Sequence, residues 1–184
     1  MARKSKRTNL HPHLQLPLGL KIRKAKATDL RPIANLFIEE FSKRPYNEKW
    51  VPRIAMKKVK KYFRTCAIFI CCCGKEIAGF VIFNPEYWFA GKICFIDEIV
   101  VRKSFQGKGV GSALFRKVEA EAKKKKMNSV FLLALVGCPA QEFYKGRGYR
   151  TNNWVLMAKA LAGQMALGWA RRFPKKLRHA MNPS

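Results

Sequence analysis

Hydrophobic and polar positions repeat along the chain at two spacings, one typical of strands and one typical of helices. Residues 20–24 alternate between apolar and basic side chains, which predicts a first strand. Thr28 and Asp29 are good helix N-caps, and the apolar residues after them recur at helical spacing until Pro45 closes the segment. A second helix is predicted over 51–63, with apolar positions on one side and basic side chains on the other.

The middle of the chain carries the signals of a β-sheet. Two apolar runs, 67–73 and 77–83, flank the tight turn Gly74-Lys75 and predict a hairpin. A third central strand is predicted over 93–101, and a glycine-bearing loop then leads into an amphipathic helix that ends in four consecutive lysines. The remaining elements are a strand, a short helix and a closing strand, predicted over 130–136, 139–146 and 154–159. This order predicts a mixed α/β layer architecture.

The composition indicates a folded core with basic extensions. The chain has 184 residues, of which 48% are hydrophobic, more than a disordered polycation contains. Lysine and arginine total 38 against 11 acidic residues, which gives a formal net charge of +27. We expect a basic N-terminal arm over 1–19, one domain over 20–160 and a basic amphipathic extension over 161–184. The net charge favours anionic partners, but it predicts neither a fold nor an activity.

Several classes of protein are disfavoured. No run of about eighteen apolar residues occurs, so a membrane-spanning helix is not expected, and the N-terminus lacks the apolar core of a secretory signal. The six cysteines form no CxxC pair and the histidines lie far from them, so we expect no metal site. Cysteines used as small buried hydrophobes are typical of a reducing compartment, which favours a cytoplasmic location.

The most informative segment is the hexapeptide QGKGVG at 106–111, which follows a predicted strand and opens a predicted helix. Glycines let the backbone turn sharply and approach a ligand closely. Free N–H groups at the positive end of a helix bind anions, and Arg102, Lys103 and Lys108 add charge nearby. The spacing fits poorly with a Walker loop, which ends in Gly-Lys-Ser/Thr, and with a Rossmann loop. For this segment alone, a plain glycine-rich turn is the alternative.

Two motifs resemble those of one family. The pattern Gln-x-x-Gly-x-Gly after strand 95–101 resembles the acetyl-CoA loop of the GNAT superfamily of N-acetyltransferases. The segment PAQEFYKGRGY at 139–149 resembles the Ala-x-x-Phe-Tyr-x-x-x-Gly-Phe/Tyr motif of that family and stands at the expected distance. The resemblance covers about 21–161. One position departs from the family pattern, because Gly137 stands where many relatives carry an asparagine that contacts the cofactor.

The resemblance implies a fold and a donor. The fold is α/β, a GNAT-like mixed sheet of about six to seven strands, splayed between the fourth and fifth and flanked by about four helices. The donor is acetyl-CoA, bound by backbone groups of the central strand and by the glycine loop. The implied cofactor-binding residues are Ile99, Val100, Val101, Gln106, Gly107, Lys108, Gly109, Val110, Gly111, Ser112 and Tyr144. The acceptor amine attacks the thioester directly, so no cysteine nucleophile is implied.

Such a reaction needs a base for the amine and an acid for the departing thiolate. Asp97 and Glu98 are the candidate bases. Neighbouring residues of a strand point to opposite faces, so we expect at most one of them to face the acceptor unless a bulge redirects the other. Similar sequences favour Glu98, and a structural hydrogen-bonding role is the alternative for either acid. Tyr144 is the candidate acid, with ordinary packing of a half-buried aromatic as its alternative.

The acceptor pocket of this family is usually built by the first two helices, their loop and the central strands. Aromatic and acidic side chains there can hold a cationic amine by cation–π and ion-pair contacts. The candidate residues are Tyr46, Glu48, Trp50 and Trp88. Ordinary packing of these aromatics is the alternative. The pattern does not choose between a small amine, a polyamine similar to an aminoglycoside, and a protein amine.

The sequence therefore predicts an N-acetyltransferase that moves an acetyl group from acetyl-CoA directly to a primary amine of a small-molecule or protein acceptor. The alternative is a nucleic-acid-associated basic protein whose GNAT-like core has a secondary or lost activity, which rests on the net charge and the basic tails. No DNA-binding motif appears, and the tails lack the interleaved aromatics of single-strand binders. Non-specific nucleic-acid binding through the tails and a homodimer both stay open.

We expect Tyr144→Phe to lower turnover while acetyl-CoA binding stays nearly intact, because the exchange removes only the phenolic proton donor. General-acid catalysis typically contributes about 10²–10⁴-fold, which sets the scale of the loss. Steady-state kinetics and a binding titration with acetyl-CoA measure the two quantities separately. Unchanged turnover at every accessible pH would remove Tyr144 from the mechanism.

Overall fold

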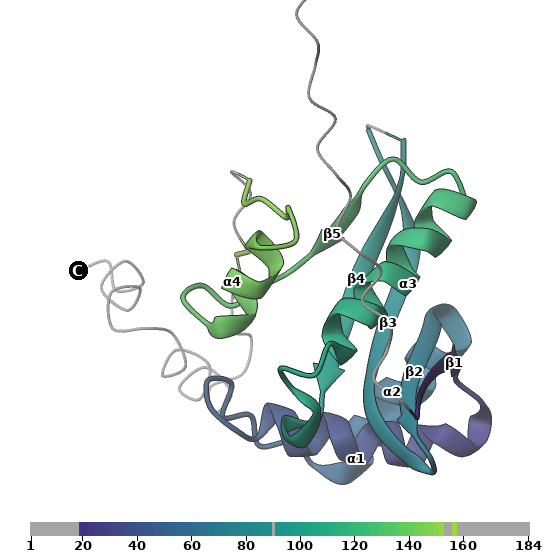
Figure 1. The fold of residues 1–184 in the computed structure, drawn as a ribbon, viewed down its shortest axis with the longest axis vertical. Helices are drawn as coiled ribbons and strands as arrows, with labels where there is room; N and C mark the ends of the chain where they lie inside the picture. The colour runs from purple at the N-terminus through teal and green to yellow at the C-terminus, as the bar shows by residue number, and fades with distance from the viewer. Residues whose placement is uncertain (1–18, 90, 153–155, 158–184) are drawn as a thin grey trace, which may run out of the picture. The chain divides into compact units, whose positions relative to one another are not determined.

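The computed structural model of the protein describes residues 19–89, 91–152 and 156–157 (Figure 1). The strands in this part of the chain are β1 (Leu20–Lys24), β2 (Ala67–Cys73), β3 (Glu76–Trp88), β4 (Gly91–Val101) and β5 (Val130–Leu132). The α-helices are α1 (Leu30–Phe41), α2 (Pro52–Thr65), α3 (Val110–Lys124) and α4 (Pro139–Lys145), and short 3-10 helices cover Ala27–Asp29 and Lys103–Phe105. The described residues divide into two compact units, the first drawn from 19–40 and 52–132 and the second from 41–51 and 133–157.

The first unit is built around one sheet with the strand order β1-β2-β3-β4-β5. The strands from β1 to β4 pair antiparallel with their neighbours, and β5 pairs parallel to β4. The predicted hairpin forms between β2 and β3, and Gly74 supplies the φ of +57° that its turn uses. β3 and β4 are the longest strands and lie side by side (Figure 1). The predicted mixed α/β architecture is confirmed.

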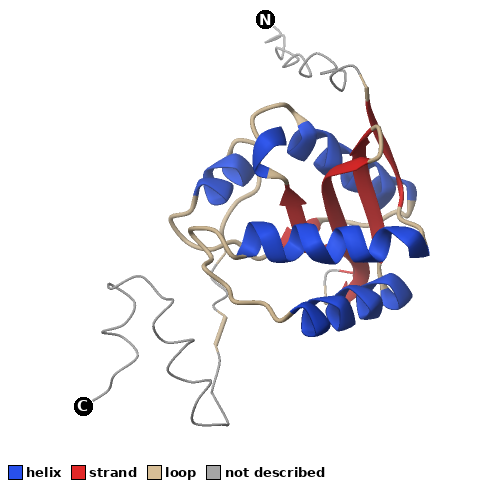
Figure 2. Ribbon diagram, turned by 90° about the horizontal axis from the view of Figure 1, so that it is seen from below, coloured by secondary structure: helices blue, strands red, loops and turns tan. Residues whose placement is uncertain are grey.

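Helices cover both faces of this sheet (Figure 2). On one face, α3 lies over Phe69, with Lys117 Nζ 4.8 Å from the ring centroid, and Phe69 stacks on Phe83 at 5.9 Å. On the other face, α2 reaches β4 through an ion pair of 2.7 Å between Lys58 and Glu98. The sheet is therefore a middle layer whose two faces are both covered, as the order of elements predicts.

The core consists of apolar side chains from the sheet and from the helices over it. The largest fully buried ones are Phe37, Phe80, Phe83, Phe115, Ile33, Leu36, Ile68, Ile70, Ile82, Ile93, Leu114 and Val59. Burying one such side chain stabilises the fold by roughly 1.5–3 kcal/mol. The packing of these side chains on β3 and β4 therefore stabilises the fold more than any single surface ion pair does. The site described below stands on these two strands.

The cysteines behave mainly as small apolar residues. All six are free thiols, and Cys71, Cys72, Cys94 and Cys138 are buried, which agrees with their predicted use. Burial raises the pKa of Cys71 and of Cys94 to about 11. These thiols therefore stay protonated at neutral pH and are poor nucleophiles.

The start of α3 packs closely against β3 at Gly79. A Cβ atom there would lie 2.7 Å from the backbone oxygen of Val100 and 3.2 Å from Cγ1 of Val110, so a larger residue requires the neighbours to shift. The contact brings the first residue of α3 against the end of β4. It thereby fixes the position of the glycine-bearing loop that joins them.

The end of the sheet differs from the prediction. The strand predicted over 130–136 ends at Leu132, and the apolar Leu133 and Val136 beyond it are 67% and 65% exposed. Residues 133–135 have no regular secondary structure, and a turn follows at Val136 and Gly137, where the φ of Gly137 is +75°. The predicted strand over 154–159 and the extensions over 1–19 and 161–184 lie almost entirely outside the described residues. The described sheet has five strands, fewer than the six to seven that the resemblance implies.

None of the helices in the described part of the chain is long and apolar enough to span a membrane.

Candidate active site

The two acids on β4 stand at an irregularity of the strand. Ile82 and Phe83 are neighbours on β3, but their partners on β4 are Glu98 and Ile96. Asp97 is therefore an extra residue on β4, which is the definition of a β-bulge. A bulge interrupts the alternation of side chains, so the rule that adjacent strand residues point to opposite faces does not hold here.

Both acids instead reach the α2 side of the sheet. Glu98 accepts a hydrogen bond of 3.3 Å from the hydroxyl of Tyr62 and pairs with Lys58 at 2.7 Å. Asp97 lies 4.0 Å from Sγ of Cys66, the residue that follows α2. The bulge is thus the exception that the sequence analysis allows for, and the rule of alternating faces does not separate this pair. The bulge also means that one face of β4 presents two carboxylates next to each other.

The two carboxylates have different surroundings. The Glu98 side chain is 11% exposed and is paired with the ammonium of Lys58. Burial, together with the charges of Glu98 and Glu86, raises the pKa of Asp97 to about 6, while the charge of Lys58 acts in the opposite direction. A carboxyl group with this pKa exchanges its proton near neutral pH, which is the property a general base needs. Burial and the two acids also raise the pKa of Tyr62 well above its usual range, so its hydroxyl remains a donor.

The glycine loop has the geometry of an anion site. Gly107 and Gly109 have φ values of +72° and +78°, and an added Cβ at either would meet open space. The α3 helix begins just after Gly109, whose carbonyl accepts the N–H of Ala113 at 2.9 Å. The N–H groups of the first helical turn, from Val110 to Ser112, therefore have no acceptor within the helix. The Nε2 group of Gln106 donates to the Val101 carbonyl at 2.9 Å and ties the loop to the end of β4.

The cations beside this loop do not share one role. Arg102 pairs with Glu39 at 2.5 Å and with Glu76 at 3.0 Å, and it also donates to the Ile77 carbonyl at 3.4 Å. This arginine therefore ties α1 and β3 to the end of β4, and the expectation that it also adds charge for an anion stays a prediction. Lys108, by contrast, lies within the loop, with its ammonium 5.7 Å from the centroid of the Phe105 ring.

Beyond Ile96, no strand among the described residues pairs with β4 on its β5 side. The parallel pairing covers Cys94 with Val130, Phe95 with Phe131 and Ile96 with Leu132. β4 continues to Val101, so in the described part of the chain the segment that contains residues 99–101 pairs with β3 and not with β5. This end of the pairing is the splay between the fourth and fifth strands that the family resemblance implies. It leaves backbone polar groups of β4 available to a ligand.

The second unit contains α4 and the tyrosine predicted as the acid. Tyr144 is half-buried, with its ring centroid 5.8 Å from that of Phe143 and 6.5 Å from that of Tyr149. The backbone N–H of Tyr149 donates to the Tyr144 carbonyl at 3.1 Å. Its ring is thus held among aromatics, which fits the packing alternative as well as the catalytic one. The N–H of Gly137 is bound at 2.8 Å by the side-chain oxygen of Gln141.

Three of the predicted acceptor residues also lie in the second unit. Nε1 of Trp50 donates to Glu48 at 2.5 Å, and the ring of Tyr46 lies 4.8 Å from that of Phe41. The carboxylate of Glu48 is therefore bound by the indole of Trp50. Trp88 belongs to the first unit, at the end of β3, where it is 38% exposed and packs against Phe131 at 4.7 Å.

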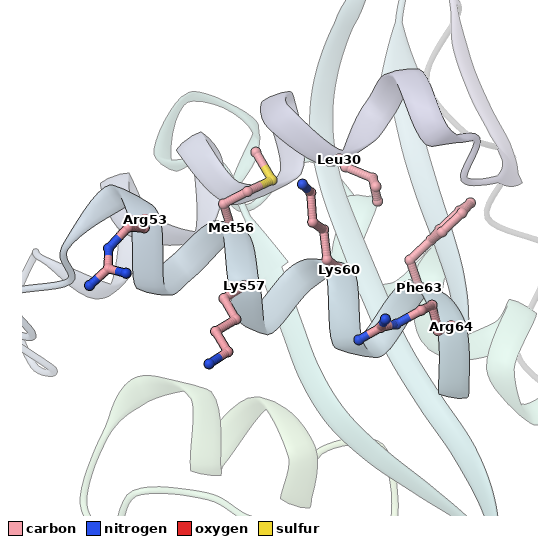
Figure 3. A pocket seen from close by; sticks show the side chains of 7 residues that line it. All are labelled: Leu30, Arg53, Met56, Lys57, Lys60, Phe63 and Arg64. Atoms are coloured by element: carbon pink, nitrogen blue, oxygen red, sulfur yellow. The ribbon is translucent and has the colours of Figure 1, made fainter.

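A hollow of about 520 Å³ lies elsewhere on the first unit, along the outer side of α2 (Figure 3). Four cations line it, at positions i, i+4, i+7 and i+11 of α2, and no acidic residue does. Its lining residues are Leu30, Arg53, Met56, Lys57, Lys60, Phe63 and Arg64. We call it the basic groove. Its charge disfavours a cationic amine, so it is not the acceptor pocket that the sequence predicts.

A model of the "Acetyltransferase (GNAT) family" matches residues 30–149 of the chain, well over half of its length. The chain belongs to the GNAT acetyltransferase family. It is therefore an enzyme of the acyltransferase class, as the two sequence motifs predict.

Solved structures share the GNAT fold with this chain at low sequence identity. One is described as a possible acetyltransferase from Clostridium difficile 630, with a TM-score of 0.69, 16% identity, and coverage of 78% of this chain and 99% of that one. Another is the aminoglycoside N-acetyltransferase AAC(6')-Iy in complex with CoA, with a TM-score of 0.66, 16% identity, and coverage of 80% and 100%. A third is the aminoglycoside acetyltransferase meta-AAC0020 of an uncultured soil metagenomic sample in complex with sisomicin, with a TM-score of 0.62, 17% identity, and coverage of 81% and 100%.

The position at which this GNAT protein departs from the family motif has a backbone reason. Gly137 has a φ of +75°, in the region that asparagine tolerates better than most other residues. Glycine and asparagine can therefore share this backbone conformation. The absence of the asparagine contact with the cofactor stays a prediction from the sequence.

Sequence reasoning missed the partners of Glu98. Lys58 and Tyr62 lie four residues apart on α2, and this spacing places both on one side of the helix. That spacing was the available signal, but Lys58 is one of six basic residues of α2, and the sequence pattern places basic side chains on the solvent side of this helix. Within residues 19–89, 91–152 and 156–157, no group of three His, Cys, Asp or Glu side chains is placed to hold a metal ion.

We expect Asp97→Asn to stabilise the fold more at pH 8 than at pH 4. The raised pKa of Asp97, about 6 against an ordinary 3.8, favours the wild-type fold at low pH, and this contribution is lost as the pH rises through 6. Asparagine does not ionise. The difference in free energy of unfolding between the Asp97→Asn variant and the wild type should therefore rise by roughly 1–3 kcal/mol from pH 4 to pH 8, in favour of the variant. This range allows for screening of the charge by water.

Urea denaturation at both pH values measures this difference. The control is Glu142→Gln, which removes a side chain that is 70% exposed on α4. An effect of Asp97→Asn that is the same at pH 4 and pH 8 would show that the Asp97 carboxyl group titrates at its ordinary pKa.

Proposed function

We propose that this GNAT enzyme transfers the acetyl group of acetyl-CoA directly to a primary amine of a small-molecule or protein acceptor. The observation that carries the proposal is the arrangement of three features in order along β4 and into α3. They are a pair of acids on one face, a strand segment that β5 leaves unpaired, and a glycine loop at a helix N-terminus. Each supplies one requirement of acetyl transfer.

The glycine loop supports the binding of a diphosphate. The open space beside Gly107 and Gly109 lets a phosphate approach the backbone, and the N–H groups from Val110 to Ser112 point to it along the helix dipole. Lys108 adds a positive charge. The residues present therefore fit the diphosphate of acetyl-CoA, which would supply an activated thioester when bound.

The unpaired segment of β4 supports the binding of an extended amide-bearing arm. Backbone groups of residues 99–101 on the side away from β3 can bond the amides of such an arm as a neighbouring strand would. An N–H donor from the same segment, aimed at the thioester oxygen, polarises the carbonyl and stabilises the oxyanion that forms on attack.

The two acids divide the work on the acceptor. Asp97 takes the proton of the acceptor ammonium, because its raised pKa of about 6 suits a base at neutral pH. Glu98 holds positive charge, as its pairing with Lys58 indicates. Similar sequences favour Glu98 as the base, but an ion-paired carboxylate is a weaker proton acceptor, so the contacts support Asp97. Two neighbouring carboxyl groups in different surroundings commonly take different roles in enzymes, one in proton transfer and one in binding charge.

The remaining roles in this proposal come from the sequence. Tyr144 donates a proton to the CoA thiolate as it departs. The residues predicted to contact the acceptor are Tyr46, Glu48, Trp50 and Trp88. The structural neighbours that act on aminoglycosides make polyamines one class of acceptor to test beside amino acids and peptide N-termini.

A second candidate function rests on the basic groove. Arg53, Lys57, Lys60 and Arg64 place four charges along one side of α2, and Phe63 lies among them. Cations that follow a phosphate backbone, with an aromatic ring for stacking, are typical of single-strand binders. On this alternative the chain is a nucleic-acid-associated protein, and acetyl transfer is secondary.

We expect turnover of acetyl-CoA with at least one primary amine from a panel of polyamines, aminoglycosides, amino acids and peptides. The rate should rise with pH through about 6, because Asp97 must be ionised to take a proton. Asp97→Asn should remove this rise and lower kcat by about 10²–10⁴-fold. Release of free thiol measures turnover. A wild-type rate that is flat from pH 5 to pH 8 would contradict the role of Asp97.

One pair of binding measurements separates the two candidate functions. We expect tight binding of acetyl-CoA, and weak binding of a single-stranded oligonucleotide that falls steeply with added salt. Reversing the four charges of the basic groove is compared with reversing the same number at Lys123, Lys124, Lys125 and Lys126. Tight oligonucleotide binding that only the groove variant loses, together with no acetyl-CoA binding, would favour the nucleic-acid function instead.

A further inference from the structure

The position next to the paired acids already holds an ammonium group. Lys58 Nζ lies 2.7 Å from the Glu98 carboxylate, 5.2 Å from the centroid of the Phe37 ring and 5.6 Å from that of the Tyr62 ring. A carboxylate with two aromatic faces is a set of groups that recognises an alkylammonium ion. The Lys58 side chain is thus bound as an external amine would be.

Lys58 differs in this respect from the other lysines of α2. Lys57, Lys60 and Lys61 are exposed to solvent, whereas the Lys58 side chain is only 30% exposed and turns toward β4. The bulge places Asp97, the proposed base, on the same side of the sheet as the carboxylate that holds this ammonium. The helix therefore presents one amine to the acids and keeps its neighbours outside.

We propose that Lys58 is an internal acceptor, which occupies the ammonium subsite of Glu98, Phe37 and Tyr62 and is acetylated by the enzyme itself. The inference rests on the proposed function, because it requires acetyl-CoA as the donor. It goes beyond that function by assigning a modification site and a self-inhibiting contact to a residue of this chain.

The step balances without a further reagent. The Asp97 carboxylate takes one proton from the Lys58 ammonium, and the lone pair on Nζ attacks the thioester carbonyl carbon. A bond from nitrogen to carbon forms, the bond from carbon to sulfur breaks, and its electron pair leaves with sulfur. The nitrogen loses a second proton after attack, and the thiolate gains one proton. The products are free CoA and a neutral acetamide on Lys58, and the proton on Asp97 passes to water.

Acetylation changes the site as well as the residue. The acetamide carries no charge, so the ion pair with Glu98 is lost and the carboxylate becomes available to the ammonium of another acceptor. Before the step, Lys58 competes with external amines for Glu98. The unmodified enzyme is therefore partly inhibited by its own side chain, and acetyl-CoA relieves this inhibition.

The test is a time course of the full chain with isotopically labelled acetyl-CoA and no added amine, followed by site-resolved mass spectrometry. We expect label on Lys58 at least about tenfold faster than on Lys57, Lys60 or Lys61, because only Lys58 is held beside the acids. The fraction labelled per unit time should not depend on protein concentration. Equal labelling of the exposed lysines, or a rate proportional to protein concentration, would overturn the proposal.

Two variants and a matched control sharpen the test. Lys58→Arg keeps the charge and removes the acceptor nitrogen, so label at position 58 should vanish, while Lys57→Arg should leave labelling of Lys58 unchanged.

The self-inhibiting contact is tested with Lys58→Gln, which has no charge at position 58 before any acetylation. Wild-type turnover of an external amine should therefore show a lag that preincubation with acetyl-CoA shortens, and the glutamine variant should show none. A wild-type lag that preincubation does not change would contradict the self-inhibiting contact.

The same preparation distinguishes this inference from the proposed function. Turnover of an external amine with no label on Lys58 would overturn the internal acceptor and leave the proposed function standing. Absence of both acetyl-CoA binding and turnover of any amine in the panel would overturn both.

Discussion

The extra residue in β4 is the constraint on which the rest of the site depends. In a regular strand, Asp97 and Glu98 would face opposite layers of the molecule, and one of them would lie beneath α3. The bulge opposite Ile82 and Phe83 turns both toward α2. One irregularity of register therefore creates two effects at once. It gathers negative charge on the face where Lys58 and Tyr62 can meet it, and it leaves Asp97 buried beside a like charge, which raises its pKa.

A protein with so few acids uses several of them in specific pairs. Asp29 binds both guanidinium nitrogens of Arg23 at 2.7 and 2.9 Å and the N–H of Lys26 at 2.7 Å, which lowers the pKa of Asp29 and fixes the approach to α1. Glu98 on β4 pairs with Lys58 of α2 at 2.7 Å. Among the described residues, four cations line the basic groove on the outer side of α2, where water can solvate exposed charges.

Local patterns in the sequence were sufficient to predict most helices and strands and the family to which the chain belongs. The hairpin at Gly74, the loop that opens α3 and the helix that carries Tyr144 each follow from residues close together in the chain. The roles at the site were harder to predict, because they depend on pairings between distant residues. The bulge exists only in the register of β4 against β3, and the cation bound to Glu98 comes from a helix forty residues earlier in the chain. The length of β5 was also not encoded by hydrophobicity, since Leu133 and Val136 are apolar and exposed.

The ties of Arg102 have a consequence for the electrostatic potential around the glycine loop. Glu39 and Glu76 lie close to the end of β4, and each would repel a phosphate that approached the neighbouring loop. The guanidinium of Arg102 stands between them and cancels much of their field at short range. Arg102 can thus support an anion site by screening the acids beside it. The N-terminus of α3 then acts on the ligand against a weaker negative field than two unpaired glutamates would produce.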